Sequence, residues 1–309
     1  MNDTKKSGVK LAKRKVSKRE MKNWIAGYIF IAPVVIGLGV FYIFPFFQNF
    51  WFGFNDVNKF NVATFCGMNN YVNLFQDKEL FAALGNTLKY VIITVPISMV
   101  LSVIVAGLLN TKIKGTSIYR TLYFLPAVTM PVAIAMVWKW IYNGEFGILN
   151  TLLEKIGIEG QNWLSNPKLA LGMVMVVGIW SAVGYNMIIL LAGMQGISKS
   201  YYEAAAIDGA GSIKQFVKIT IPMLTPTLFF VMITSIISGF QVFDTIYMMI
   251  GKTSLAFATT QSLVMIFYRH AFDYGNKGYA AAISIFIFGI IMIVTVFQLI
   301  MQKKWVNYE

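Results

Sequence analysis

The stretch Glu203-Ala-Ala-Ala-Ile-Asp-Gly-Ala-Gly-Ser-Ile-Lys-Gln-Phe-Val-Lys-Ile-Thr-Ile-Pro222 decides how this chain is organised. It is a polar island between two apolar runs, near residues 169–193 and 223–250, that are each long enough to cross a bilayer. A polar stretch in this position lies at a membrane surface. The rest of the chain indicates which surface that is.

Each half of this island carries a helix-start signal. Ser200 stands three residues before Glu203 and Ser212 three before Gln215, so each half can begin with a capping box in which side chains satisfy free backbone N–H groups. Glycines 209 and 211 lie between the halves, where a helix end needs a residue that tolerates positive φ. The pattern predicts a short helix, a tight turn and a second short helix.

The composition is that of a membrane protein. Hydrophobic residues make up 57% of the chain, charged residues 13%, and the mean hydropathy is +0.64. Soluble domains contain roughly 45 to 50% apolar residues. Apolar runs of spanning length occur near residues 24–50, 86–109, 121–142, 169–193, 223–250 and 279–301. We therefore expect an all-α integral membrane protein with six transmembrane helices and a cytoplasmic helix-turn-helix loop.

The basic residues set the expected orientation. If the amino terminus is cytoplasmic, most of the 26 Lys and Arg fall on the inner side, including those of the island. The positive-inside rule then places both termini and the island in the cytoplasm. Residues 1–23 form a basic cytoplasmic tail that lies against anionic lipid, and residues 24–309 form one membrane domain. Because topology and this tail explain the net charge of +13, nucleic-acid binding is rejected.

The sequence offers little for catalysis or metal binding. Cys66 is the only cysteine and His270 the only histidine, so a disulfide within the chain is impossible and a metal site built from these ligands is not expected. The chain also lacks a Gly-rich phosphate loop followed by Lys-Ser or Lys-Thr. We expect no catalytic residues, no metal and no cofactor bound by this chain.

The island resembles the cytoplasmic loop of ABC importer permeases. That loop has the pattern Glu-Ala-Ala, three residues, Gly, nine residues, Ile, two residues, Pro, and every position is matched here. The resemblance implies that residues 198–222 form a coupling loop that sits in a groove of an ATP-binding subunit. Its coupling residues would be Glu203, Ala204, Ala205, Asp208, Gly209, Ile219 and Pro222. The three alanines from Ala204 to Ala206 leave a surface poor in side chains, which another protein can approach closely. The alternative, a capped alanine helix alone, predicts neither the glycine nor the downstream Ile and Pro.

Other stretches are similar to the carbohydrate-uptake branch of these permeases, and in particular to the first, larger-maltose-permease-like subunit. They include Cys66-Gly-Met-Asn-Asn-Tyr71, Arg120-Thr-Leu-Tyr-Phe-Leu-Pro126, Gly147-Ile-Leu-Asn150, Leu191-Ala-Gly-Met-Gln-Gly-Ile197 and Gly278-Tyr-Ala-Ala-Ala282. The resemblance implies three kinds of protein partner: a second permease in a heterodimer, two copies of an ATP-binding subunit that hold ATP and Mg, and an extracytoplasmic sugar-binding lipoprotein or periplasmic protein. It also implies a location in the bacterial cytoplasmic membrane.

A substrate path is expected where polar residues share one face of a span. In the fifth span Thr234, Ser238, Gln241 and Thr245 recur at intervals of four, three and four, and Asp244 lies three residues after Gln241. A carboxylate at that depth is costly unless it faces a partner helix or a wet cavity. The alternative for these side chains is hydrogen bonding between helices without contact to a solute.

The fourth span is expected to supply the opposite wall through Ser181, Tyr185 and Asn186, because aromatic faces suit sugar rings and amides suit hydroxyls. Pro126 and Pro131 within the third span predict a bent helix near the path.

Three alternatives stay open. The same architecture serves an importer of a related polyol or glycerol-phosphate-type solute. A secondary transporter would need broken helices in inverted halves or a chain of intramembrane ionisable groups, and a membrane-embedded transferase would need clustered carboxylates or metal ligands. The sequence shows neither of these patterns.

Overall fold

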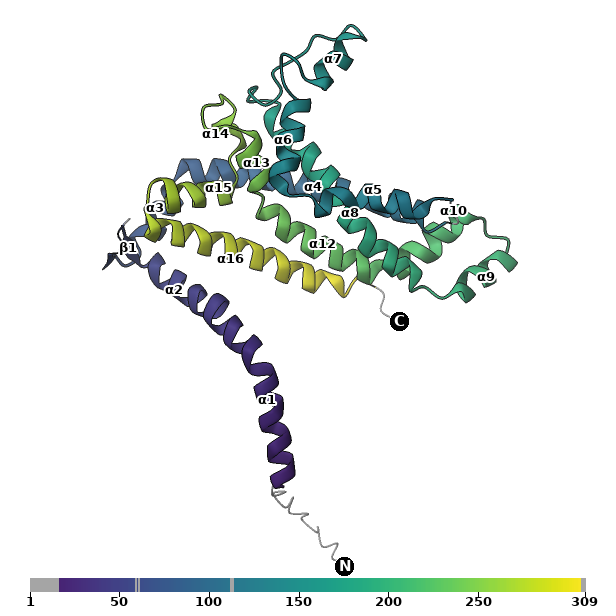
Figure 1. The fold of residues 1–309 in the computed structure, drawn as a ribbon, viewed down its shortest axis with the longest axis horizontal. Coiled ribbons are helices and arrows are strands. Elements are labelled where there is room, and N and C mark those ends of the chain that lie inside the picture. The colour runs from purple at the N-terminus through teal and green to yellow at the C-terminus, as the bar shows by residue number, and fades with distance from the viewer. Residues whose placement is uncertain (1–16, 59, 61, 112–113, 307–309) are drawn as a thin grey trace, which may run out of the picture. The chain divides into compact units, whose positions relative to one another are not determined.

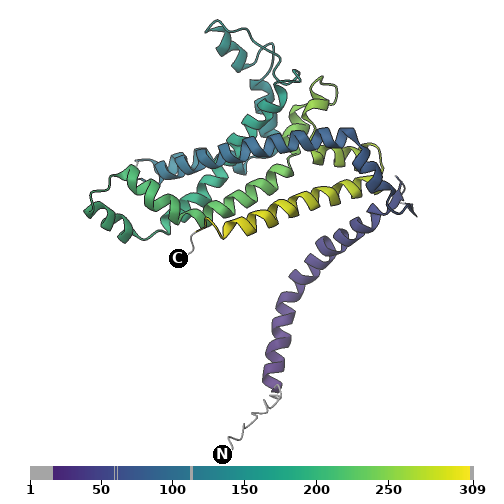
Figure 2. The same cartoon turned by 180° about the vertical axis from the view of Figure 1, so that it is seen from behind.

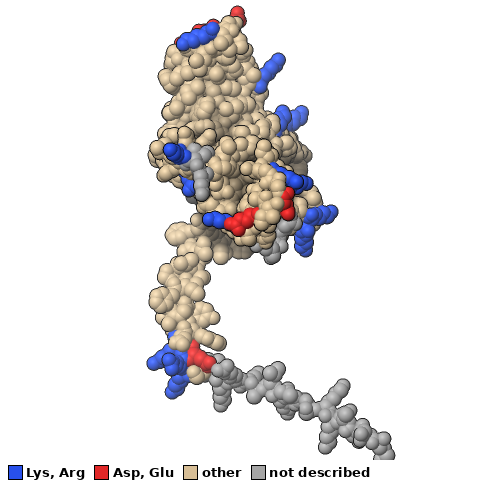
Figure 3. Space-filling model, turned by 90° about the vertical axis from the view of Figure 1, so that its right-hand side faces the viewer, with Lys and Arg blue, Asp and Glu red and all other residues tan. Residues whose placement is uncertain are grey.

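Helices form nearly all of the regular structure (Figures 1 and 2). The computed structural model describes residues 17–58, 60, 62–111 and 114–306. The expected all-α architecture is confirmed, with one short two-stranded sheet as an addition. Figure 3 shows a surface that is mostly uncharged, with Lys and Arg in a few groups.

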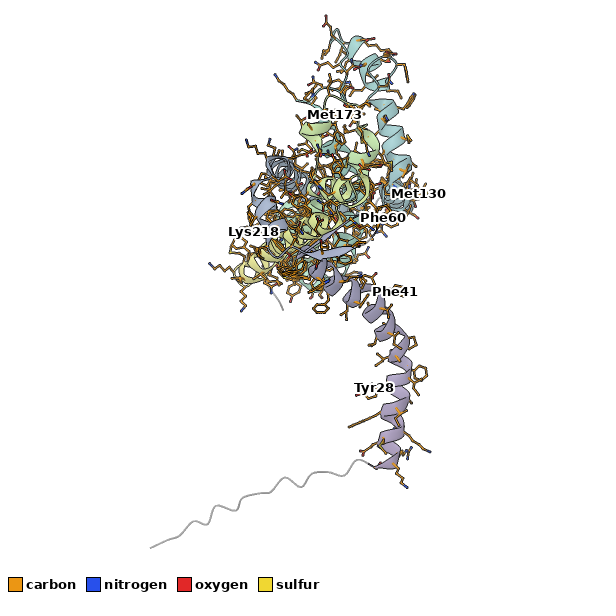
Figure 4. The ribbon with its side chains drawn as sticks, turned by 90° about the vertical axis from the view of Figure 1, so that its left-hand side faces the viewer. Tyr28, Phe41, Phe60, Met130, Met173 and Lys218 are labelled. Carbon is orange, nitrogen blue, oxygen red and sulfur yellow. The ribbon has the colours of Figure 1, made fainter. Side chains whose placement is uncertain are left out.

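The chain divides into two compact units, residues 1–51 and 52–309. The first unit contains α1 (Lys18–Leu38), the π-helical turn η1 (Gly39–Ile43) and most of α2 (Phe44–Gly53). A capping box between Ser17 and Glu20 begins α1, so the end of the expected basic tail is already helical, while residues 1–16 lie outside the described part. These helices expose apolar side chains along their length, among them Tyr28 and Phe41 (Figure 4). Such side chains are expected on a segment that lipid or other membrane helices surround.

The second unit is built on four longer helices: α4 (Lys78–Leu109), α8 (Ala170–Gln195), α12 (Thr225–Phe240) and α16 (Lys277–Gln302). In both ribbon views α4, α12 and α16 run side by side. The hydroxyl of Ser102 on α4 donates to the carbonyl of Val183 on α8 at 3.3 Å, where both residues are buried. Small residues and such backbone contacts let membrane helices pack closely.

Two helix pairs are sharply bent. The axes of α5 (Thr116–Val128) and α6 (Pro131–Ile141) differ by 101°. Met130, at the corner, has ψ 131°, since a residue before proline is disfavoured in the α region. The second pair joins Ser212–Met223 to α12 with a bend of 65°. The bend expected from Pro126 and Pro131 is therefore present.

The six expected spans correspond to single helices or bent pairs. Among the described residues, four helical segments are long and apolar enough to cross a membrane, and the number rises to six if each bent pair is one span. The fifth span differs from the prediction, because its helix ends at Phe240 and a separate helix, α13 (Asp244–Met249), follows. The helical stripe expected from Thr234 to Thr245 is therefore interrupted after Phe240.

One end of the bundle carries the short elements β1 (Asn55–Val57), β2 (Ala63–Phe65), α3 (Asn69–Gln76), α14 (Phe257–Thr260), α15 (Leu263–Tyr268) and the π-helical turn η3 (Arg269–Asp273). The strands pair antiparallel, with Asn55 opposite Phe65. The buried Asn70 amide donates to the carbonyls of Gly53 at 3.1 Å and Asn55 at 2.9 Å, which fixes the sheet to α3. Another helix, α7 (Ile148–Glu154), lies in the segment between α6 and α8.

An ion-pair cluster holds this end together. The guanidinium of Arg269 contacts the carboxylate of Glu79, and the Gln261 amide donates to that carboxylate at 3.0 Å. Arg269 also donates to Gln261 Oε1 at 2.6 Å and lies over the rings of Phe257 and Tyr274. The cluster ties the start of α4 to the segment between α14 and η3.

Candidate functional site

Two adjoining cavities lie among the helices of the second unit. The first has a volume of about 300 Å³ and is lined by α4, α8, α12 and α13. The second, of about 410 Å³, lies between the α5–α6 corner and the junction of α12 with α13. Both are lined by Ser181, Tyr185, Ser238, Val242 and Thr245. These shared walls place the cavities side by side.

The predicted substrate-path residues converge on these cavities. Tyr185 and Ser238 line both, Asn186 lines the first, and Gln241 and Asp244 line the second. The two walls expected from the fourth and fifth spans therefore face each other. Contact of these side chains with a substrate stays a prediction.

The polar residues of the fifth span do not form one helical stripe, in contrast to the prediction. The chain leaves the helix at Gln241, and Asp244 begins α13. The break is stabilised by a distant residue: the buried Ser262 hydroxyl donates to the carbonyl of Val242 at 2.6 Å. Asp244 and Gln241 are exposed at the wall of the second cavity.

Asn186 also has a structural role. Its side chain is only 3% exposed, and Nδ2 donates to the hydroxyl of Ser235 on α12 at 3.3 Å. This contact is the interhelical hydrogen bond that the alternative reading of such residues describes. Asn186 therefore joins α8 to α12 at the wall of the first cavity.

Helix α4 forms a third wall of the first cavity, which the sequence analysis did not predict. Tyr90, Thr94 and Ser98 line the first cavity, at a spacing of four residues on one helix face. The hydroxyl of Thr94 donates to the carbonyl of Tyr90 at 2.7 Å, and that of Ser98 to Val95 at 3.0 Å, so both are satisfied within their own helix. Their regular spacing is the one sequence feature that they share, and it does not by itself distinguish a cavity wall from helix packing.

The predicted helix-turn-helix is present as α9 (Lys199–Ile207) and α10 (Ser212–Gln215). Neither predicted capping box forms. Ser198 caps α9, because the helix begins earlier than expected, and the hydroxyl of Ser200 lies 2.8 Å from that of Ser198. The N-cap of α10 is Gly211, and the Gln215 amide donates instead to the carbonyl of Ala210 at 2.9 Å.

Gly209 makes the turn between these helices. Its φ is +73°, in the left-handed region that favours glycine. The N–H of Ala210 donates to the carbonyl of Ala205 at 2.9 Å, and that of Gly209 to Ala206 at 3.1 Å, which is a Schellman motif. The prediction for Gly209 is confirmed, whereas Gly211 has φ −70° and does not need the left-handed region.

The two short helices present an apolar and largely side-chain-poor surface. Glu203, Ala204 and Asp208 are exposed and Ala205 is half-buried. The side chains of Ile207 and Ile213 are 87% and 82% exposed, on either side of the turn. Figure 3 faces this end of the molecule and shows both basic and acidic side chains on it. Exposed isoleucines beside basic residues are typical of a surface that another protein covers.

The helix pair is attached firmly to the bundle. The hydroxyls of Tyr202 and Thr220 share a hydrogen bond at 2.9 Å, which joins α9 to the π-helical turn η2 (Phe216–Thr220). The ring of Phe216 packs against Gly107 near the end of α4, where a Cβ would come within 2.8 Å of the ring. Of the remaining predicted coupling residues, Ile219 lies in η2 and Pro222 in the following α11 (Ile221–Met223). These contacts join α9 to η2 and η2 to α4.

Residues 85–307, which carry both the cavities and this helix pair, match the family of binding-protein-dependent transport system inner membrane components. The chain belongs to this family. It is thus a permease component of such a transport system, and the membrane-spanning character of its helices follows from the family as well as from their length.

Several relatives of this permease cover almost its full length. A probable ABC transporter permease protein of Bacillus subtilis (YesP) is 34% identical over 96% of each chain. The arabinooligosaccharides permease AraP of the same organism is 32% identical, over 89% of this chain and 87% of its own. The trehalose/maltose permease MalF of Thermococcus litoralis is 31% identical, over 92% of this chain and 95% of its own.

The fold of the permease is also that of a solved transporter. A chain in the crystal structure of a bacterial ABC transporter involved in the import of alginate has a TM-score of 0.84 and 21% identity, and the match covers 94% of this chain and 99% of that chain. At this identity the likeness shows the fold alone.

Proposed function

We propose that this permease takes up a sugar or oligosaccharide that an extracytoplasmic binding protein delivers. Hydroxyl, amide and aromatic side chains from three helices converge on the two cavities, and such groups suit sugar hydroxyls and ring faces. Relatives named for arabinooligosaccharides and for trehalose and maltose support the solute class. The convergence of these walls on one polar region is the observation that carries the proposal.

The energy source is a separate subunit. The sequence has no phosphate-binding loop, so ATP and Mg bind to a partner ATPase, in two copies, and a second permease completes the pore. The exposed surface of α9 and α10 is the docking surface for one ATPase copy. This end faces the cytoplasm together with both termini, as the distribution of basic residues indicates.

Transport proceeds by alternating access. Closure of the ATPase pushes α9 and α10. The contact of Tyr202 with Thr220 carries that movement to η2, which leads through α11 into α12, and the contact of Phe216 with Gly107 carries it to α4. Because α4 and α12 both line the first cavity, their displacement changes which side of the membrane the cavity faces.

A phosphorylated solute such as glycerol phosphate is the second candidate, since a relative from Yersinia pestis, 27% identical, is named for it. The charges of the cavities favour a neutral solute. Their described lining residues include Asp244 but no Lys or Arg, and a phosphate would need a cationic partner.

The test uses the complex of this chain with its second permease and ATPase, reconstituted with the binding protein. We expect Gln241→Ala to weaken the sugar dependence of stimulated ATPase activity by about 1 to 3 kcal/mol, because a hydrogen bond to a hydroxyl is lost. Gln48→Ala, on the exposed surface of α2, is the matched control and should behave as wild type. Asp244→Asn removes the negative charge but keeps a side chain that can form hydrogen bonds, so it distinguishes the effect of the charge from that of hydrogen bonding.

The outcomes separate the steps of the proposal. A sugar response of Gln241→Ala and Asp244→Asn equal to wild type would show that the cavities do not hold the solute. Absence of any stimulation by a sugar-loaded binding protein in the wild-type complex would overturn the sugar importer itself. Stimulation by a phosphorylated solute alone would favour the second candidate.

A further inference from the structure

A further cavity lies between α4 and α8, away from the two just described. Its volume is about 580 Å³, and it shares no lining residue with them. Four polar side chains line it: Asn86 and Lys89 from α4, Lys168 just before α8, and Thr259 from α14. The function proposed above makes no use of it.

The two lysines mark one boundary of the membrane. Residues 90–109 of α4 carry no charged side chain, and this stretch is about as long as the roughly 20 residues that cross the hydrocarbon layer. Lys89 directly precedes it. Lys168 likewise precedes α8, whose residues 170–195 are uncharged. Both lysines therefore lie at the level of the lipid headgroups.

This boundary is the one opposite α9 and α10. Helix α8 leads from Lys168 towards α9, and the far end of α4 packs on Phe216. Figure 4 looks at the molecule from the end away from α9 and α10, with Met173 labelled on the first turns of α8.

The cavity is cationic. Among the described residues that line it none is acidic, and neither lysine has an acidic partner within the described part of the chain. The side chains of both lysines are exposed. The Asn86 amide donates to the carbonyl of Gln261 at 3.1 Å, which fixes the segment after α14 against α4 and so shapes this wall.

The remaining lining is apolar and continues into the membrane. Ile93 lies one turn beyond Lys89 on α4, and Leu171 and Met175 follow Lys168 on α8. A soluble phosphate ion would use the lysines but leave these side chains without a partner. An anion that carries acyl chains uses both parts of the cavity.

We propose that this cavity binds the headgroup of an anionic phospholipid, with the phosphodiester between Lys89 and Lys168 and the start of an acyl chain along Ile93 and Met175. The leaflet is the one opposite the α9–α10 surface. The hydroxyl of Thr259 donates to the carbonyl of Ala256 at 3.0 Å, which leaves its oxygen to accept a hydrogen bond from a headgroup hydroxyl. The proposal does not depend on which solute is transported.

The test measures lipid retention by the purified complex that contains this chain, using native mass spectrometry after equilibration with nanodiscs of phosphatidylcholine and phosphatidylglycerol. Wild type should retain phosphatidylglycerol in preference to phosphatidylcholine. Lys89→Gln and Lys168→Gln should each reduce that preference about fivefold, which corresponds to ~1 kcal/mol for a basic residue at an anionic membrane surface. Lys89→Arg keeps the charge and should keep the preference.

Lys139→Gln is the matched control, since Lys139 is an exposed lysine of α6 that does not line the cavity. Equal retention of the two lipids by wild type, or an unchanged preference in both neutral variants, would overturn the proposal. Displacement of bound phosphatidylglycerol by inorganic phosphate would also overturn it, in favour of a site for a soluble anion. These readouts involve no transported sugar, so they are independent of the function proposed above.

Discussion

At the scale of single residues, Gly209 determines the geometry of the α9–α10 turn. Its φ of +73° is accessible to glycine but costs other residues about 1 to 2 kcal/mol. No neighbouring atom lies within 4 Å of a Cβ built at this position, so the effect of a substitution comes from the backbone alone. Gly209→Val should therefore change the angle between α9 and α10 while membrane insertion stays normal.

We expect Gly209→Val to lower solute-stimulated ATPase activity and labelled-sugar uptake in the reconstituted complex. Gly211→Ala is the control, because Gly211 has φ −70° and open space around it, and it should match wild type. Full uptake by Gly209→Val would show that this turn is not part of the coupling surface.

At the opposite end of the bundle, His270 is expected to make the stability of the protein depend on pH. Burial lowers the pKa of His270 from its ordinary value of 6.5, Arg269 lowers it further, and the carboxylates of Asp77 and Glu79 act against this effect. The folded protein thus favours neutral imidazole. The contribution of His270 to stability is complete above pH 6.5 and is lost as the pH falls through the lower, folded-state pKa.

We expect the thermal midpoint of the purified complex to fall on acidification through this window. His270→Gln should give a shallower dependence on pH there, whatever its midpoint at neutral pH. Identical slopes for the two proteins would exclude His270 as the titrating group.

At the scale of elements, close helix contacts depend on glycine. A Cβ at Gly184 of α8 would clash with the backbone carbonyl of Tyr123 on α5, and a backbone atom cannot move aside as a flexible side chain can. Gly184→Ala should destabilise the complex by about 1 to 3 kcal/mol through overpacking.

The control is Gly289→Ala on α16, where no atom lies within 4 Å of the added Cβ. The thermal midpoints of the two variants, measured in one detergent, make the comparison. Equal midpoints would mean that α5 moves away from α8 without cost, and that their crossing is looser than the structure describes.

At the scale of the whole molecule, the chain exposes polar groups that need a partner. Gln241 and Asp244 are exposed at the wall of a cavity within the membrane-spanning unit, and lipid cannot satisfy them. We expect the chain produced alone to aggregate or self-associate, and co-expression with its cognate second permease to yield a defined complex on size-exclusion chromatography. A stable monomer without the second permease would contradict a pore that two permeases share.

Local features of the sequence were enough to predict the helical membrane fold. The length of each apolar run identifies a span, because the hydrocarbon layer has a fixed thickness and every backbone polar group within it must be paired. The position of Gly209 identifies the turn, because only glycine adopts positive φ without cost. Pro131 identifies the corner between α5 and α6, since proline disfavours the α region for the residue before it, whereas Pro126 is accommodated inside α5.

The tertiary structure decided what these local signals left open. The fifth span ends at Phe240 because the hydroxyl of Ser262, twenty residues along the chain, satisfies the carbonyl of Val242. Tyr90 and Thr94 of α4 became cavity residues only through the packing of α4 on α8 and α12. Lys89 and Lys168 face one cavity because α4 and α8 lie side by side. A residue's own sequence neighbourhood determines its backbone conformation, whereas the groups that meet across helices depend on distant parts of the chain.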